Sequence, residues 1–288
     1  HIIGVDGGGS TCRVAIASFG GQVLGAANGA AANPSTSMVQ AVACLNETLQ
    51  AARSNAGLSA TEFSCAAVHA GLAGVISAEI ASAVADAMPF DRVSVTDDRP
   101  TNMIGALGGE DGFLAALGTG SFLGRQKRDN QHFVGGWGLV LGDQASGAWI
   151  GRALLSRVLE WRDGLHPVSP LLEQVFADHG NDPARIVLSA TEAEPTAFGE
   201  LALPVLQAAA EGDQAGLAIA GEAGAYVQQA LDLLGFQPGD PLCLAGGIGP
   251  HLSPYLAARY KKNLVAPRGT ALDGALRLAA GIAAQGPQ

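Results

Sequence analysis

Charged and aromatic side chains are both scarce in this chain of 288 residues. Lys, Arg, Asp and Glu together make up 15% of the sequence and aromatic residues 5%, whereas apolar residues reach 48%. This composition allows a sizeable buried core and suits two domains of ordinary size. The formal net charge of −10 argues against nucleic acid or an anionic membrane surface as a partner, because both would repel an acidic protein.

Cysteine is also rare, and its spacing excludes two kinds of site. Cys12, Cys44, Cys65 and Cys243 are far apart and form no C-x-x-C pair, so neither a zinc knuckle nor a disulfide framework is indicated. Such cysteines are typical of buried thiols in a cytoplasmic protein. Since no run of 18 uninterrupted apolar residues occurs, the sequence predicts no membrane-spanning helix.

A glycine-rich turn near the start of the chain is the first feature that points to chemistry. An apolar run ends in Gly7, Gly8, Gly9, Ser10 and Thr11, and an alternating apolar run follows it. This pattern predicts two strands joined by a tight hairpin. Glycine lets backbone N–H groups approach an anion closely, and the two hydroxyls add donors, so the turn is predicted to bind phosphate. No Gly-Lys-Ser/Thr follows it, which excludes a Walker loop.

An acidic residue stands directly before this turn. The Asp6 carboxylate would repel a phosphate unless a divalent cation lay between them. The position therefore predicts Mg²⁺ held by Asp6 through water. The alternative is an ordinary glycine hairpin that happens to contain an aspartate.

The same pattern occurs a second time in the middle of the chain. The apolar run Phe113–Leu117 leads into Gly118, Thr119, Gly120 and Ser121, and another apolar run follows. Gly7, Gly9 and Ser10 match Gly118, Gly120 and Ser121 at one constant offset. A unit that recurs at a domain-sized interval indicates a duplicated fold whose two halves face each other.

The order of predicted elements agrees with this duplication. Three strands, then helix, strand, helix, strand and helix form the order of a ribonuclease H-like α/β fold. The first domain is predicted to hold residues 1–110 and a returning C-terminal helix, 275–288. The second is predicted to hold residues 111–274, with a helical insertion. The two hairpins resemble those of the sugar kinase, Hsp70 and actin superfamily, which implies two actin-like ATPase domains that face each other across an ATP cleft.

Two adjacent carboxylates stand where a predicted strand ends and a helix begins. At that edge of an α/β sheet, Asp97 and Asp98 are placed to take a proton from a substrate hydroxyl. The alternative is that one of them only caps the helix that Pro100 starts. Counting back from Ile104-Gly105-Ala106 and comparing with the kinase pattern favours Asp98 as the base.

The two stretches with the most specific sequence pattern are Gly135-Gly136-Trp137-Gly138 and Gly142-Asp143-Gln144-Ala145-Ser146-Gly147. They resemble the N-acetylglucosamine kinases and the wider group of BadF/BadG/BcrA/BcrD-type ATPases. The resemblance implies a sugar site that contains Asn33, Asp98, Gly136, Trp137 and Asp143. In it Trp137 borders the sugar's 2-substituent, and Asp143 binds sugar hydroxyls or organises Mg²⁺. The alternatives are a core anchor for Trp137, a first-turn helix charge for Asp143 and a simple turn for Asn33.

A third glycine cluster, Ala245-Gly246-Gly247-Ile248-Gly249, resembles the adenosine motif of the superfamily. The resemblance implies that Gly246, Gly247 and Gly249 bind the nucleoside. It also implies an ATP- and Mg²⁺-dependent kinase that phosphorylates N-acetylglucosamine or glucosamine at the 6-hydroxyl, with N-acetylglucosamine favoured. Gln144 and Phe122 depart from the family pattern near the sugar, which leaves the specificity for the acyl group open.

Two other functions share this fold. One is an activator ATPase of a 2-hydroxyacyl-CoA dehydratase, which would need paired cysteines for an iron–sulfur cluster. The other is a sugar-sensing relative without catalytic activity. The expected partners are the small amino sugar and ATP, with no nucleic acid and no membrane, and a homodimer is compatible with the resemblance.

Overall fold

The computed structural model describes residues 1–128 and 130–285, and the chain divides into two compact units. Unit 1 holds His1–Glu110 together with the segment that starts at Pro267, and unit 2 holds Asp111–Ala266. The returning segment thus begins at Pro267, whereas the sequence predicts residue 275. The Arg268 N–H donates to the Ala106 carbonyl at 2.9 Å, which ties this segment to unit 1. Residues 286–288 of the predicted C-terminal helix lie outside the described residues.

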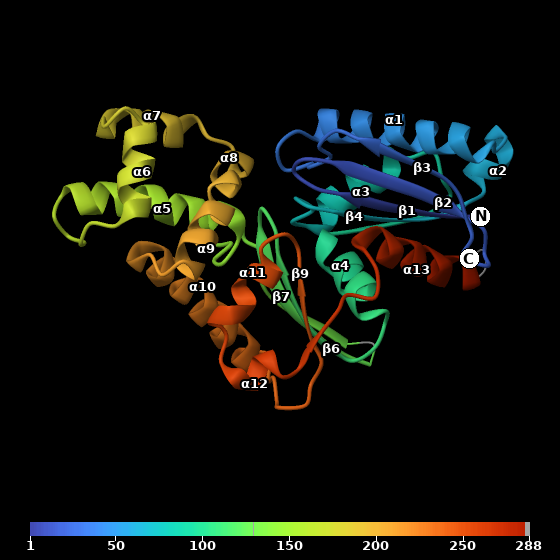
Figure 1. Cartoon of the computed structure of the whole chain (residues 1–288). Coiled ribbons are helices and arrows are strands. Elements are labelled where there is room, and N and C mark those ends of the chain that lie inside the picture. The colour runs from blue at the N-terminus through green and yellow to red at the C-terminus, as the bar shows by residue number, and fades with distance from the viewer. Residues whose placement is uncertain (129, 286–288) are drawn as a thin grey trace. The chain divides into compact units, whose positions relative to one another are not determined.

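Figure 1 shows the elements in order along the chain. Those of unit 1 are β1 (Ile2–Gly7), β2 (Cys12–Ala17), β3 (Val23–Gly29), α1 (Met38–Ala56), α2 (Ala60–Ser64), β4 (Ala67–Leu72), α3 (Ala78–Asp86), β5 (Arg92–Thr96), α4 (Asp98–Leu107) and the returning α13 (Ala271–Ala284).

Unit 2 opens with β6 (Gly112–Leu117), β7 (Ser121–Lys127) and β8 (Asn130–Gly135). Its helical part contains α5 (Gly147–Arg162), α6 (Pro170–Asp178), α7 (Pro183–Glu192), α8 (Pro195–Glu200), α9 (Ala202–Ala210) and α10 (Gln214–Leu233). It closes with β9 (Leu242–Ala245), α11 (Gly249–Leu252), the short 3-10 turn η1 (Ser253–Tyr255), α12 (Ala258–Lys261) and β10 (Leu264–Val265).

The two sheets repeat one topology. In unit 1 the strand order is β3-β2-β1-β4-β5, and in unit 2 the order β8-β7-β6-β9-β10 is the same. The first three strands of each sheet are antiparallel, and the last two run parallel to the first. The predicted α/β class and the duplicated ribonuclease H-like order are therefore confirmed.

In unit 1 helices cover both faces of the sheet. Helix α1 packs on β2 and β3, whereas α13 packs on β1, β4 and α4 on the other face (Figure 1). Helices α4 and α13 approach so closely that a Cβ on Gly105 would lie 1.9 Å from the Thr270 carbonyl oxygen. A Cβ on Gly274 would lie 2.0 Å from the Thr101 carbonyl oxygen. Because these two positions are glycine, α4 and α13 can pack closely together. Helix α13 also lies against β1, the strand that leads into the first glycine turn.

In unit 2 one buried core joins the sheet to the helical insertion. It includes Leu117 and Leu123 of the sheet, Ile150 and Leu154 of α5 and Val227 of α10. The polar region from Asp163 to Glu200, which the sequence predicts as the helical insertion, contains α6, α7 and α8. Within residues 1–128 and 130–285, no helix has the length and apolar character needed to cross a lipid bilayer.

Candidate functional site

The first glycine turn connects β1 and β2. It is closed by the Gly8 N–H, which donates to the Thr11 carbonyl oxygen at 2.8 Å. The residues at its tip, Gly9, Ser10 and Thr11, are exposed. A Cβ on Gly9 would meet no atom within 4 Å, whereas one on Gly7 would lie 2.5 Å from Leu72 Cδ2. Gly9 therefore leaves space for a ligand, and Gly7 is needed for packing.

Asp6 lies one residue before this turn and faces Arg13 across the hairpin. Arg13 Nη2 donates to Asp6 Oδ2 at 2.5 Å. Burial raises the pKa of Asp6, and the nearby Arg13 charge opposes this change. No described residue donates to the second carboxylate oxygen, which is the kind of ligand that Mg²⁺ prefers. The residues present thus fit a water-mediated magnesium site.

Asp97 and Asp98 have different surroundings although they are adjacent. Asp97 caps α4, since its Oδ1 accepts from the Arg99 backbone N–H at 2.9 Å, and it also forms an ion pair with the Arg99 side chain. Asp98 is the first residue of α4, and no described residue donates to its carboxylate from a side chain. Burial, followed by the charges of Asp97 and Asp6, raises the pKa of Asp98 to about 6. Asp97 is therefore committed to the helix cap, and the Asp98 carboxylate is available.

Asn33 lies in a constrained turn of unit 1. Its Oδ1 accepts from the Ser35 backbone N–H at 3.0 Å, and Ser35 Oγ donates to the Gly74 carbonyl at 2.6 Å. Gly74 has a φ of 86°, and a Cβ there would lie 1.9 Å from Asn33 Oδ1. The turn thus occupies the side-chain oxygen of Asn33, whereas its amide nitrogen makes no hydrogen bond to a described residue.

The second glycine turn, in unit 2, is held by the start of α5. The Gly118 N–H donates to the Gly120 carbonyl at 2.9 Å, and the Gly147 N–H donates to the Gly118 carbonyl at 2.7 Å. Ser121 Oγ donates to the Gln144 carbonyl at 2.7 Å. The Ser121 hydroxyl therefore fixes the loop before α5.

The loop before α5 places Asp143 against this second turn. Asp143 has a φ of 56°, and its Oδ1 accepts from the Gly138 N–H at 3.1 Å. A Cβ on Gly120 would lie 2.9 Å from Asp143 Oδ2, so the carboxylate contacts the glycine turn. Burial raises the pKa of Asp143.

Trp137, after Gly136 with its φ of 80°, has 74% of its surface exposed. A role as a core anchor is therefore wrong for this tryptophan. Its indole is accessible to a ligand of unit 2.

A cavity of about 470 Å³ lies within unit 2 beside the second turn. Its lining residues are Gly118, Thr119, Gly147, Thr196, Gly199, Glu200, Leu203, Gly247 and Ile248. The structure thus brings the predicted phosphate turn and the predicted adenosine motif to one space. Thr196, Glu200 and Leu203 come from α8 and α9, and no sequence motif marks them.

The other two glycines of the adenosine motif serve the strand-to-helix turn itself. Gly246 has a φ of 81°, and a Cβ there would lie 2.3 Å from the Leu117 carbonyl oxygen. A Cβ on Gly249 would lie 3.0 Å from the Leu244 carbonyl carbon. Ile248 N–H donates to the Leu117 carbonyl at 2.9 Å, so this turn is bonded to the end of β6. Gly247 is the one that lines the cavity.

Two copies of a ribonuclease H-like fold, each with a glycine turn after its first strand, place the chain in the actin-like ATPase class. Within this class, residues 3–258 match the sequence profile of the BadF/BadG/BcrA/BcrD ATPase family. The chain belongs to this family, and the resemblance drawn from the Gly-Gly-Trp-Gly and Gly-Asp-Gln motifs is confirmed.

Comparisons with individual proteins agree with this family match. The chain is 29% identical over 280 residues to the glucosamine kinase GspK of Vibrio cholerae, covering 97% of this chain and 95% of the relative. It is also 29% identical over 166 residues to an N-acetylmuramic acid/N-acetylglucosamine kinase of Clostridium acetobutylicum, covering 56% and 54%. A crystal structure from Chromobacterium violaceum, described as a candidate N-acetylglucosamine kinase, superposes with a TM-score of 0.87 at 35% identity, covering 96% and 98%.

Proposed function

We propose that this protein is an ATP-dependent kinase that phosphorylates an amino sugar at its 6-hydroxyl. The observation that carries the proposal is the cavity of about 470 Å³. Gly118 and Thr119 of the second glycine turn line it together with Gly247 of the predicted adenosine motif. A space of this size, lined by small residues and next to an anion-binding turn, suits an adenosine with its phosphates. The names of the similar proteins favour an amino sugar as the acceptor.

Binding of the nucleotide would use both glycine turns. The phosphate oxygens would lie against the turn of Gly7, Gly8, Gly9, Ser10 and Thr11 and the turn of Gly118, Thr119, Gly120 and Ser121. The N–H groups of Gly8 and Gly118 close the turns themselves, so the contacts would come from other N–H groups of the two turns. Magnesium would be held through water by Asp6. Asp143, which stands against the second turn, would bind sugar hydroxyls or organise Mg²⁺. When bound, Mg²⁺ supplies positive charge that offsets the charge of the phosphates.

Transfer itself would use Asp98 as the general base. Its carboxylate would accept the proton of the sugar hydroxyl while the hydroxyl oxygen bonds to the γ-phosphorus and the bond to ADP breaks. A pKa of about 6 leaves the carboxylate ionised at neutral pH and basic enough to take that proton. Asp97 does not compete for this role, because it caps α4 and pairs with Arg99.

The sugar would be bound by Asn33, Asp98, Gly136, Trp137 and Asp143. The exposed indole of Trp137 offers an apolar face to an N-acetyl methyl group. The amide nitrogen of Asn33 offers a donor to a sugar hydroxyl. Because the similar proteins differ in their amino sugar, the preference for N-acetylglucosamine over glucosamine belongs to this proposal.

A coupled ADP-release assay with Mg-ATP tests the proposal. We expect activity with N-acetylglucosamine or glucosamine, little with glucose, and almost none without sugar or in Asp98→Asn. Two-dimensional ³¹P–¹H NMR of the product should show the phosphate on oxygen 6. ADP release that is equal with and without sugar would overturn the kinase assignment.

Iron measurement on anaerobically purified protein separates the activator ATPase from the kinase. An activator ATPase needs cysteines that hold a cluster between subunits. Cys12 and Cys243 are buried, Cys44 is half-buried and Cys65 is exposed, so the four cysteines offer no exposed pair and we expect no iron. Stoichiometric iron with sugar-independent ATPase activity would favour the activator.

A further inference from the structure

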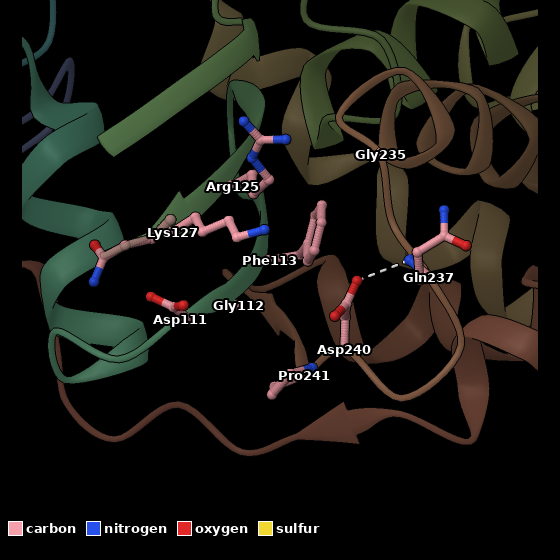
Figure 2. A pocket seen from close by; sticks show the side chains of 10 residues that line it. Asp111, Gly112, Phe113, Arg125, Lys127, Gly235, Gln237, Asp240 and Pro241 are labelled. Atoms are coloured by element: carbon pink, nitrogen blue, oxygen red, sulfur yellow. Dashed lines mark hydrogen bonds between the residues drawn. The ribbon is translucent and has the colours of Figure 1, made fainter. Parts of the chain in front are cut away.

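Unit 2 contains a second cavity, of about 210 Å³, whose charged side chains balance (Figure 2). Arg125 and Lys127 line it together with the carboxylates of Asp111 and Asp240. Asp240 Oδ2 also accepts from the Gln237 backbone N–H at 2.8 Å. This cavity therefore offers a charged ligand no net attraction.

In unit 1, one histidine is buried in an otherwise apolar strand. Strand β4 has the sequence Ala-Val-His-Ala-Gly-Leu, and all of its residues are buried. His69 is 3% exposed, and burial lowers the pKa of its imidazole to about 4, so the ring is neutral at neutral pH. Burial of a polar ring has a cost in free energy that an apolar side chain would not have. The feature that sets His69 apart is the hydrogen bond that its ring makes.

This hydrogen bond joins His69 to Thr96, the last residue of the neighbouring strand β5. His69 Nε2 lies 3.3 Å from Thr96 Oγ1. The Thr96 hydroxyl has a single proton, which it donates to the Asp97 carbonyl at 2.7 Å. Thr96 Oγ1 can therefore only accept from His69, and the neutral imidazole carries its proton on Nε2. A directed chain of two hydrogen bonds thus runs from the His69 ring through the Thr96 hydroxyl to the Asp97 carbonyl.

The chain ends at the peptide group that joins Asp97 to Asp98. No described residue donates to the Asp98 carboxylate from a side chain, so the backbone that carries this carboxylate sets its position. The carbonyl of Asp98 itself accepts from Thr101 Oγ1 and from Asn102 Nδ2, each at 2.8 Å. Side-chain hydrogen bonds therefore fix the backbone on both sides of Asp98.

We propose that His69 and Thr96 are positioning residues for Asp98. The Nε2–H of His69 holds the Thr96 hydroxyl in the orientation that bonds the Asp97 carbonyl, and this bond fixes the peptide group from which Asp98 starts. A displacement of about 1 Å at a reacting group can lower the rate about 10²-fold, so a fixed backbone matters for a base. The inference rests on the proposed function, because it concerns the base of the phosphoryl transfer.

Steady-state kinetics of variants at both positions tests this role. His69→Leu removes the donor, and Thr96→Val removes the hydroxyl with little change in shape. We expect each to lower kcat by about ten- to a hundredfold, with KM for ATP and for the sugar near the wild-type values, because only the position of the base changes. His69→Gln, which has a side-chain N–H donor, and Thr96→Ser, which keeps the hydroxyl, should recover most of the lost kcat.

The double variant His69→Leu/Thr96→Val separates positioning from packing. Because His69 acts through Thr96, the double variant should be no slower than Thr96→Val alone. Val68→Ala is the matched control, since Val68 is fully buried on the same strand and faces the opposite side of the sheet. It should lower Tm but leave kcat unchanged at temperatures where the variant is folded.

Long-range ¹H–¹⁵N NMR of protein labelled at histidine measures the tautomer without any activity assay. We expect the His69 ring, identified by its absence in His69→Gln, to be neutral with its proton on Nε2. A proton on Nδ1, an unchanged kcat in Thr96→Val, or losses that add in the double variant would overturn the positioning role while the kinase assignment stands. A wild type without sugar-dependent ADP release would overturn the proposed function, and this role with it.

Discussion

The Asp6 carboxylate accepts a hydrogen bond of 2.5 Å from the Arg13 guanidinium, directly across strands β1 and β2. The Asp6 side chain is 9% exposed and that of Arg13 is 49% exposed. The pair therefore supplies a mostly buried carboxylate with positive charge beside the first glycine turn. A metal ion at this glycine turn would share the carboxylate with Arg13. We therefore expect Asp6 and Arg13 to determine how strongly the activity depends on the Mg²⁺ concentration.

Substitution of Asp6 by Asn should raise the magnesium requirement. We expect the Mg²⁺ concentration for half-maximal activity to rise about tenfold, because an amide replaces the charged oxygen that favours the ion, while the sugar KM stays near its wild-type value. Arg13→Met serves as the opposite change, since it frees Asp6 for the metal and should lower or keep the requirement. A magnesium curve that is the same in Asp6→Asn and the wild type would leave Asp6 as a structural residue of the hairpin.

The two adjacent aspartates should separate into one catalytic and one structural residue. Asp98→Asn should lower kcat by ~10²–10⁴-fold, as expected for loss of a positioned base, with ATP binding unchanged. Asp97→Asn keeps a side-chain oxygen for the cap but loses the charge that pairs with Arg99, so its main effect should be on stability, below about 1 kcal/mol. Steady-state kinetics and thermal unfolding of both variants check this. The reverse pattern would move the base to Asp97.

The pKa of Asp98 predicts opposite pH effects on activity and on stability. As base it must be ionised, so kcat/KM should rise with pH through about 6. Its folded-state pKa lies above the ordinary value of 3.8, so the folded protein binds this proton more tightly than the unfolded chain does. Protonated Asp98 thus adds to the free energy of unfolding. This contribution is fully present below pH 3.8 and is lost as pH rises through about 6.

Asp98→Asn should therefore be more stable than the wild type at pH 8, on the order of 1–3 kcal/mol, and differ less at pH 4. Urea unfolding at the two pH values measures this. A variant that is equally destabilised at both would mean that Asp98 holds the fold together.

Substitution of the neighbouring residues Gly246 and Gly247 should affect different properties, stability in the first case and ATP binding in the second. A Cβ on Gly247 would meet no atom within 4 Å, and this residue lines the cavity of unit 2. Gly247→Leu should fill that space and raise the ATP KM about tenfold or more, with little change in stability. Gly246→Ala should instead destabilise the protein, because its φ of 81° and the contact with the Leu117 carbonyl oppose a side chain. Thermal unfolding and ATP titration distinguish the two, and an unchanged ATP KM in Gly247→Leu would argue against nucleotide binding in this cavity.

Trp137 should act on the choice of sugar. Since the indole is 74% exposed, Trp137→Ala should leave the stability nearly unchanged. We expect kcat/KM to be highest for N-acetylglucosamine, lower for glucosamine and lowest for glucose, and the variant to lose mainly the advantage of the acetyl group, ~1–3 kcal/mol at most. The six kcat/KM values decide the matter. If glucosamine leads and the variant affects all three sugars equally, the acetyl-pocket argument is wrong while the kinase assignment stands.

The sequence by itself determined the duplicated fold and its two glycine turns. Both are encoded locally: strand alternation and glycine clusters lie within a few residues of each other, so their spacing survives in the linear chain. The Gly-Gly-Trp-Gly and Gly-Asp-Gln motifs were likewise sufficient for the family. The returning segment was predicted less well, because its start at Pro267 depends on contacts with α4 that no local pattern records.

Tertiary structure decided which of these residues are available for chemistry. It committed Asp97 to the cap of α4, directed the Ser121 hydroxyl to the Gln144 carbonyl and paired Asp6 with Arg13. Thr196, Glu200 and Leu203 reached the cavity only because α8 and α9 fold back onto the start of α5. A hydroxyl or carboxylate has the same identity in the sequence whether it is free or bound, and only the packing of distant segments supplies or withholds its partner.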